Sequence, residues 1–312
     1  MTMGSANHDR IFAAAIDWAG APMAIATVVE TWKSAPCPVG THMLVHADGR
    51  FVGSVSGGCV EGDVLERAHM ILAGAPPVLR RYGIADDAAW DVGLPCGGDI
   101  QVLVQPVSAD GFPAHLFADI MKARSAGAAL SVVTDLESGR SALLDDDAGA
   151  GFVNIYHPPR RLLIVGAVEI ASALAAIAVS QGVDVTLCDP RGRFLTAERF
   201  PGIRLDDRWP DDAVKAFAPD SRSAIVTLSH DPKIDDPALA AALASPAAYV
   251  AALGSVRSHQ ARLARLSAAG VSAEQCARIE GPAGVAINAI SAPEIALSIA
   301  GGMIRAFNQG LR

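Results

Sequence analysis

The second half of the chain alternates short apolar runs with alanine-rich stretches of helical spacing, and this rhythm constrains the fold more than any other feature. Strands that alternate with helices form parallel sheets covered on both faces. The sequence therefore predicts a doubly wound, Rossmann-like parallel sheet domain over residues 158–312. The apolar runs lie at residues 161–165, 183–188, 224–228 and 248–253.

Residues 1–157 follow a different pattern, which predicts a separate mixed α/β domain together with a connecting segment. A chain of 312 residues has room for two domains. Pro158-Pro159 is a plausible boundary between them. Helices are predicted over 9–19, 60–72 and 114–126, a strand over 25–29, a hairpin around an Asp48-Gly49 turn, a strand over 100–105 and a hairpin over 130–144.

The composition limits the function classes. With 51% hydrophobic and 19% charged residues the chain is typical of a packed globular protein. Its net charge of -8, with no compensating Lys/Arg cluster, argues against nucleic acid as a partner. The N-terminus lacks the layout of a signal peptide, and apolar stretches such as 171–179 are too short to span a bilayer. We expect a cytoplasmic protein without a membrane span.

Five cysteines form an odd, irregularly spaced set, which does not indicate a disulfide framework. Cys59 lies in the segment SGGCVEG, directly before a predicted helix. Gly57-Gly58 would let backbone N–H groups converge there, and the positive end of the helix would lower the pKa of the Cys59 thiol, giving an anion site with a thiolate. The alternative is a plain strand-to-helix turn with Cys59 packed beneath it.

A second cysteine beside two glycines occurs in the segment PCGGD, which contains Cys96, Gly97 and Gly98. Two such clusters in one domain suggest two loops that converge on one small anionic or metal-containing ligand. Thiolates from Cys59 and Cys96 would suit a soft metal, whereas the paired spacings of a structural zinc site are missing. The alternative for Cys96 is a small buried residue in a turn.

Three segments of the first domain, ETWKSAPCPVG at 30–40, GSVSGGCVE at 53–61 and PCGG at 95–98, resemble the N-terminal domain of the XdhC/CoxI accessory family. The second domain is also similar to the nucleotide-binding-like domain of that family. The matching segments there are residues 161–166, 188–191, 229–233 and 252–255. The resemblance spans nearly the whole chain, and the first domain is the more specific match.

This resemblance implies an accessory protein rather than an enzyme. Members bind molybdenum cofactor (molybdopterin), protect it, assist its sulfuration with a cysteine desulfurase and insert it into a molybdenum hydroxylase of the xanthine dehydrogenase type. A homodimer is possible, because cofactor clefts often lie at subunit contacts. By analogy Cys59 and Cys96 would contact the metal or its sulfido group, or Cys59 would carry a persulfide. The other residues implied in cofactor binding in this domain are Ser56, Gly57, Gly58, Glu61, Gly97 and Gly98.

The first turn of the Rossmann-like domain departs from the dinucleotide-binding pattern. Gly166 is present, but Val168 stands where a second glycine lets a pyrophosphate approach the backbone. Glu169 adds a competing negative charge at the start of the helix. Asp189 lies where a ribose-binding acid is expected, with a strand-end cap as the alternative. We therefore expect weak or absent NAD(P) binding, which disfavours the alternative function of an NAD(P)-dependent oxidoreductase.

Three histidines are further candidate ligands. His230-Asp231 follows an apolar run, at the sheet edge where ligands of such folds bind. The pair would either bind a ligand or form a turn in which Asp231 starts the next helix. His42 and His46 share one face of a predicted strand and are interpreted as exposed polar residues, since no third ligand accompanies them.

Overall fold

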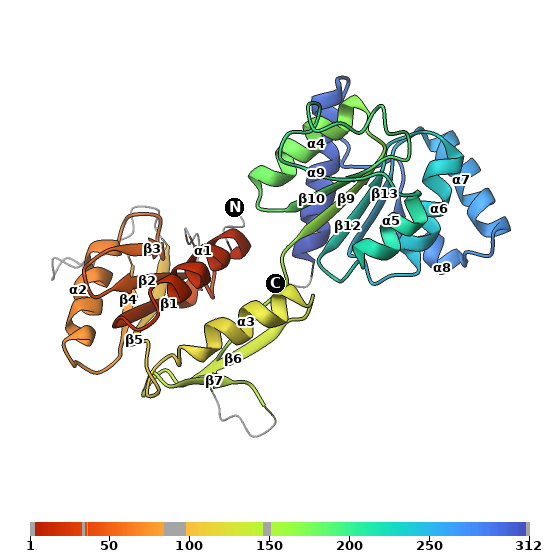
Figure 1. Ribbon diagram of the computed structural model, residues 1–312. Coiled ribbons are helices and arrows are strands. Elements are labelled where there is room, and N and C mark those ends of the chain that lie inside the picture. The colour runs from red at the N-terminus through yellow and green to blue at the C-terminus, as the bar shows by residue number, and fades with distance from the viewer. Residues whose placement is uncertain (1–3, 33–34, 36, 84–97, 146–150, 310–312) are drawn as a thin grey trace. The chain divides into compact units, whose positions relative to one another are not determined.

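The computed structural model describes residues 4–32, 35, 37–83, 98–145 and 151–309. The chain divides into two compact units, Met1–Pro158 and Pro159–Arg312, one residue from the boundary expected from the sequence. Unit 1 is a mixed α/β unit and unit 2 is built on a parallel sheet (Figure 1). The predicted fold class is thus confirmed.

Unit 1 contains a five-stranded sheet in the order β3-β2-β1-β5-β4 and a three-stranded sheet in the order β7-β6-β8. The described helices are α1 (Gly4–Asp17), α2 (Glu61–Leu72) and α3 (His115–Ser125). The strands are β1 (Met23–Trp32), β2 (His42–His46), β3 (Phe51–Gly53), β4 (Val78–Tyr82), β5 (Asp99–Pro106), β6 (Leu130–Thr134), β7 (Ser141–Leu143) and β8 (Phe152–Tyr156). The predicted hairpin at the Asp48-Gly49 turn is the antiparallel pair β2 and β3.

The five-stranded sheet is covered on both faces, and the central strand β1 shows why. Ala24 and Ala26 point into the core beneath α2, whereas Met23 and Ile25 point into the core beneath α1 and α3. This alternation follows from the two-residue period of a strand. The helices α2 and α1 accordingly lie on opposite sides of the sheet (Figure 1).

His42 is buried, at 1% exposure, so the expectation of an exposed polar residue is wrong. Its Nδ1 lies 2.8 Å from Thr27 Oγ1 and its Nε2 lies 2.8 Å from the Tyr156 hydroxyl. Burial, and next the nearby His8, lower the pKa of His42, so the ring is neutral. Polar partners on β1 and β8 therefore make this histidine part of the core, and a sequence pattern does not reveal partners so distant in the chain.

Unit 2 has a six-stranded parallel sheet in the order β11-β10-β9-β12-β13-β14. The strands are β9 (Arg161–Val165), β10 (Asp184–Cys188), β11 (Arg204–Asp206), β12 (Ser223–Thr227), β13 (Tyr249–Ala252) and β14 (Ile279–Glu280). The helices are α4 (Glu169–Ser180), α5 (Pro210–Phe217), α6 (Pro232–Leu243), α7 (Val256–Ala268), α8 (Ala273–Cys276) and α9 (Ala292–Asn308). Helices α4 and α9 cover one face and α5 to α8 the other (Figure 1).

The order of these strands corresponds to 3-2-1-4-5-6, with β9 as the first strand. The order reverses between β9 and β12, and the carboxyl ends of these two strands are where ligands of such folds bind. The turn after β9 and the residues after β12 are therefore the parts of unit 2 to inspect for a site.

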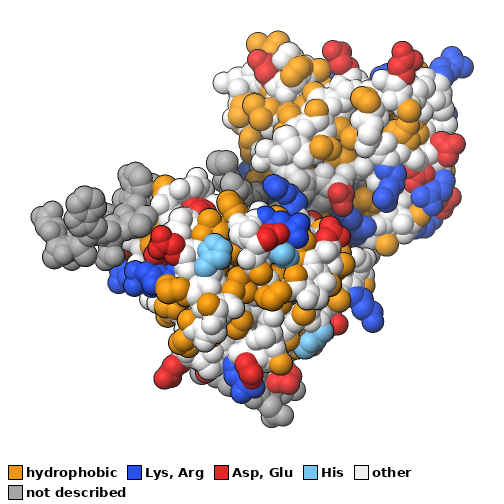
Figure 2. Space-filling view, turned by 60° about the vertical axis from the view of Figure 1, so that its left-hand side comes forward, with side chains coloured by type: hydrophobic (Ala, Val, Ile, Leu, Met, Phe, Trp, Pro, Cys, Tyr) orange, Lys and Arg blue, Asp and Glu red, His pale blue; other side chains and the backbone are white. Residues whose placement is uncertain are grey.

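Charged side chains of both signs are interspersed on the visible surface. Figure 2 shows no broad basic area on that face of the described residues. Among the described helices, none is long and apolar enough to cross a membrane.

Candidate functional site

The segment before α2 is wound around the side chain of Glu61. Its carboxylate accepts hydrogen bonds from backbone N–H groups and from two serine hydroxyls, so most polar groups of the segment point to one centre. The donors are Ser54 Oγ, Val55 N (3.1 Å), Ser56 N (2.9 Å), Ser56 Oγ (2.6 Å), Gly58 N (2.8 Å) and Val60 N (3.2 Å). We call residues 54–60 together with Glu61 the Glu61 loop.

The two serines bind the remaining amides of this loop. Gly57 N donates to Ser54 Oγ at 2.8 Å, and Cys59 N donates to Ser56 Oγ at 2.9 Å. The sequence pattern indicates that the N–H groups of Ser56, Gly57 and Gly58 would receive an anion. In the structure they are bonded to the chain's own side chains, so these backbone donors do not form an open anion site.

Burial of Glu61, which is 9% exposed, would raise the pKa of its carboxyl, but hydrogen bonds from Ser54 and Ser56 outweigh burial and lower the pKa to about 2. Glu61 is therefore a carboxylate at neutral pH, and its oxygens are saturated with donors. In the structure its carboxylate is used to hold the loop in shape, and its role in cofactor binding stays a prediction. The sequence pattern predicts neither the contact of Ser54 nor this role of Glu61. The feature that could have indicated it is an acidic residue in the first turn of a helix.

Cys59 is exposed on the Glu61 loop, so the alternative in which it is packed beneath the turn is wrong. The preceding Gly57 and Gly58 adopt positive φ angles of 77° and 118°, which side chains rarely tolerate. The buried thiol in this region belongs to Cys37, which lies near Ser54 O. Burial, and then the charge of Glu61, raise the pKa of Cys37 to about 11, so Cys37 is an unreactive thiol.

Cys96 and Gly97 lie outside the described residues, whereas Gly98 directly precedes β5. Ile100, two residues further, pairs with Tyr82 on β4. The Tyr82 hydroxyl donates to Asp63 at 2.6 Å, in the first turn of α2. Gly98 thus directly precedes a strand that pairs with β4, and Tyr82 on β4 contacts the first turn of α2, the helix that follows Cys59.

The sequence predicts metal ligation by Cys59 and Cys96. Within the described part of the chain, no three His, Cys, Asp or Glu side chains are grouped closely enough to hold a metal ion. Cys59 is thus an exposed soft donor, and ligation by Cys59 together with Cys96 stays a prediction, because Cys96 lies outside the described residues.

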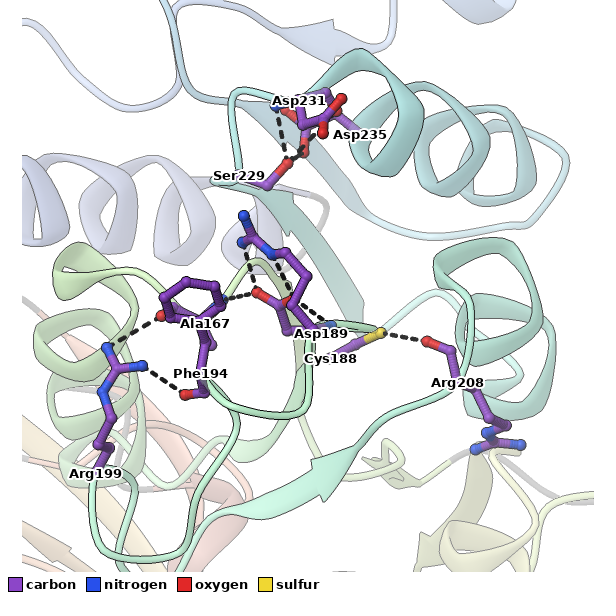
Figure 3. A network of polar contacts seen from close by, with 10 residues as sticks. Ala167, Cys188, Asp189, Phe194, Arg199, Arg208, Ser229, Asp231 and Asp235 are labelled. Carbon is purple, nitrogen blue, oxygen red and sulfur yellow. Dashed lines mark hydrogen bonds and ion pairs between the residues drawn. The ribbon is translucent and has the colours of Figure 1, made fainter.

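In unit 2 the turn after β9 approaches the end of β12 closely. Gly166 has φ 111°, and a Cβ there would lie 2.7 Å from Ser229 N, so a glycine is required. Ala167 N donates to Asp189 Oδ2 at 2.8 Å, and Arg199 donates to Ala167 O at 3.1 Å. The turn is therefore closed by the chain's own side chains (Figure 3).

Asp189 is fully buried and accepts four hydrogen bonds. Besides Ala167 N, the donors are Arg191 N (2.9 Å), Nε (2.9 Å) and Nη2 (2.8 Å). Burial would raise the pKa of Asp189, but the bonds from Arg191 outweigh it and lower the pKa. The Asp189 carboxylate thus caps the end of β10 by binding the neighbouring backbone and Arg191. This geometry favours the strand-end cap over ribose binding.

His230 is exposed with φ 60°, and Asp231 is the N-cap of α6, accepting a hydrogen bond from Lys233 N at 2.9 Å. The structure thus agrees with the turn interpretation of this pair. Ser229 donates to Asp235 at 2.7 Å, beside Asp231 (Figure 3).

These contacts lead to a test of dinucleotide binding. Because Asp189 is saturated and Glu169 places a carboxylate in the first turn of α4, we expect no saturable heat of binding when NAD(H) is titrated into the full chain. Isothermal titration calorimetry at micromolar concentrations measures it. Tight binding with a stoichiometry of one per chain would contradict the expectation.

The fold and the loops define a class: proteins that join an α/β unit carrying an exposed cysteine loop to a Rossmann-type unit. The profile of the XdhC and CoxI family matches residues 18–83, and that of the XdhC Rossmann domain matches residues 162–303. The chain is also 30% identical over 293 residues to the molybdenum cofactor insertion chaperone PaoD of Escherichia coli K12, covering 88% of this chain and 80% of PaoD. The chain therefore belongs to the XdhC/CoxI family.

Two further proteins are similar over most of the chain. A Bacillus subtilis 168 protein, named as a probable subunit of xanthine dehydrogenase, is 24% identical over 312 residues, covering 90% of this chain and 92% of that protein. A crystal structure of a Bacillus halodurans protein described as a xanthine dehydrogenase superposes with a TM-score of 0.76 at 24% identity, covering 96% of each chain. The latter likeness shows the fold.

Proposed function

We propose that this protein is a chaperone of molybdenum cofactor, which binds the cofactor at the Glu61 loop and delivers it to a partner enzyme. The observation that carries the proposal is the exposed Cys59 on a loop whose other polar groups are occupied by Glu61. Family membership and the similarity to the insertion chaperone PaoD support the cofactor assignment.

The Cys59 thiol fits this ligand, whereas the loop amides differ from what we expected. The thiol of Cys59 suits a soft metal centre, and the ligand would supply that centre together with an anionic phosphate. The loop amides are bonded internally, so the phosphate needs a different receptor. Cys59 would hold the metal end, while Glu61 keeps the loop in shape. Cys96, Gly97 and Gly98 would complete the site from the second cysteine segment.

The finer parts of the proposal follow from the same loop. An exposed thiol can accept or pass on sulfur, so we place assistance in sulfuration, with a cysteine desulfurase as sulfur donor, at Cys59. The recipient of the cofactor would be a molybdenum hydroxylase of the xanthine dehydrogenase type. An oxidoreductase function of unit 2 has less support, because Asp189 is used within the fold.

Purification of the full chain from cells that make the cofactor tests the proposal. Wild type should carry molybdenum and a pterin that fluoresces after oxidation, and Cys59→Ala should lose most of both. Cys276→Ala, which removes a buried thiol from unit 2, is the control and should retain them. A wild-type protein free of molybdenum and pterin would refute the chaperone function, and undiminished loading of Cys59→Ala would refute the role of Cys59.

A further inference from the structure

Two arginines and a tyrosine gather around Asp63, which lies in the first turn of α2, directly after the Glu61 loop in the sequence. Arg67 Nη2 is 3.1 Å from Asp63 Oδ1, and Arg80 Nε is 3.9 Å from Asp63 Oδ2. The Tyr82 hydroxyl donates to the same carboxylate at 2.6 Å. Asp63 is four residues after Cys59 in the sequence. We call these four residues, Asp63, Arg67, Arg80 and Tyr82, the α2 basic cluster.

The α2 basic cluster has more positive than negative charge. One carboxylate, Asp63, faces two guanidinium groups, and Tyr82 adds no charge because burial, then its bond to Asp63, raise its pKa. Among the described residues, the Nε atoms of Arg67 and Arg80 are buried and have no hydrogen-bond partner. Both side chains remain accessible, at 30% and 37% exposure. An anion can therefore reach the exposed part of these two side chains without unfolding, whereas their Nε atoms are covered.

The neighbouring Arg81 is different, because its charge is matched. It faces away from α2, bonds to Asp99 at 3.0 Å and stacks on Trp32 at 4.6 Å. The period of a strand places Arg80 and Tyr82 on one face of β4 and Arg81 on the other. Among the described residues, the excess charge of this cluster therefore lies on the face of β4 that carries Arg80 and Tyr82.

We propose that Arg67 and Arg80 receive the phosphate group of the ligand whose metal end contacts Cys59, an inference that rests on the proposed function. Guanidinium groups bind phosphate through paired, charge-assisted hydrogen bonds. The amides of the Glu61 loop are unable to perform this task, since their hydrogens point to Glu61, Ser54 and Ser56. In a chain of net charge -8, a local positive excess also attracts an anionic ligand.

The test compares the full-length wild type with Arg67→Gln/Arg80→Gln. Two probes are used: cofactor released from a purified molybdoenzyme, followed by pterin fluorescence, and inorganic phosphate, followed by phosphorus NMR. The double variant should bind both probes roughly 10-fold or more weakly, because charge-assisted bonds to phosphate are lost. Arg140→Gln, which breaks an exposed pair with Asp110, is the control and should bind as wild type does.

Asp63→Asn gives a change of opposite sign. It removes the carboxylate that competes for both guanidinium groups while keeping an acceptor for Tyr82, so phosphate should bind a few-fold more tightly. A purely structural role of the cluster would weaken binding in both variants, and that result would overturn the inference. Melting curves establish that each variant is folded.

The outcomes separate this inference from the proposed function. Equal affinity of wild type and the double variant for the cofactor would refute the phosphate site and leave the chaperone function intact. Phosphate binding that depends on Arg67 and Arg80, in a wild type that takes up no cofactor, would refute the chaperone function and retain an anion site. A wild type that binds neither probe would refute both.

Discussion

Replacement of Glu61 by glutamine is expected to disrupt the loop that carries Cys59. The carboxylate accepts backbone N–H groups from Ser56 and Gly58 among its donors. Glutamine offers one acceptor oxygen in place of two, and its side-chain N–H groups would face the N–H and O–H groups that donate to Glu61. Loss of a charged acceptor with buried donors costs about 3 kcal/mol, which would lower the melting temperature of unit 1 by roughly 6 to 12 °C.

Calorimetric melting and the reactivity of Cys59 measure this effect. Iodoacetamide should label Cys59 in wild type, and the rate should change in Glu61→Gln as the thiol loses its fixed surroundings. Glu66→Gln, an exposed glutamate on the same helix, is the control and should melt as wild type does. A Glu61→Gln protein with wild-type melting and cofactor retention would show that the carboxylate does not organise the loop.

The pH dependence of the same variant has a defined sign. The pKa of Glu61 is lowered from 4.5 to about 2 on folding, so its contribution to stability is complete above the unfolded value and is lost as the pH falls through the folded value. The difference in melting temperature between wild type and Glu61→Gln should therefore be constant above pH 4.5 and shrink towards pH 2. A difference that grows on acidification would contradict the assigned state of Glu61.

Replacement of Asp189 by alanine is expected to destabilise unit 2 strongly. The carboxylate is fully buried and accepts from Ala167 N and from the Arg191 guanidinium. Its removal leaves a buried amide unpaired, for which a loss of about 1 to 3 kcal/mol is typical, and deprives the partly exposed Arg191 guanidinium of its partner. The free energy of unfolding from urea titration measures it.

The chain contains a matched comparison for Asp189→Ala. Asp206 also pairs with the arginine two residues later, accepting from Arg208 N, Nε and Nη2. Its side chain is 10% exposed. Among the described residues the Asp206 side chain accepts only from Arg208, whereas Asp189 also holds the turn at Ala167, so Asp206→Ala should cost less than half as much. Equal losses in the two variants would mean that the bond to Ala167 contributes nothing.

The strands that the sequence does not predict all lie at sheet edges, whereas the edge strands β3 and β7 were expected only as parts of hairpins. Apolar runs identify the central strands β1, β5, β9 and β12, which are flanked by neighbours on both sides. The same criterion does not detect β4, β8, β11 and β14, each of which lies at the edge of its sheet. An edge strand such as β4, with the sequence VLRRY, needs fewer buried residues, because it pairs on one side only.

The sequence predicts which segment forms the loop of the candidate site, but not which groups its hydrogen bonds join. The glycines before Cys59 correctly indicate a tight loop at the start of a helix, since Gly57 and Gly58 have positive φ. Which group the amides bind depends on how the Glu61 side chain folds back, and no spacing rule specifies this. The α2 basic cluster is likewise invisible in the sequence, because Arg67 and Arg80 come from different elements that meet through packing.

The internal carboxylate of the Glu61 loop has a consequence for the kinetics of loading and release. A loop that a ligand must order loses conformational entropy on binding, and this loss weakens affinity. Here Glu61 has already fixed the backbone around Cys59, so the bare protein is pre-organised. If the cofactor binds at this loop as proposed, it would meet a surface whose hydrogen bonds are already formed, and its departure would leave those bonds in place for the next ligand.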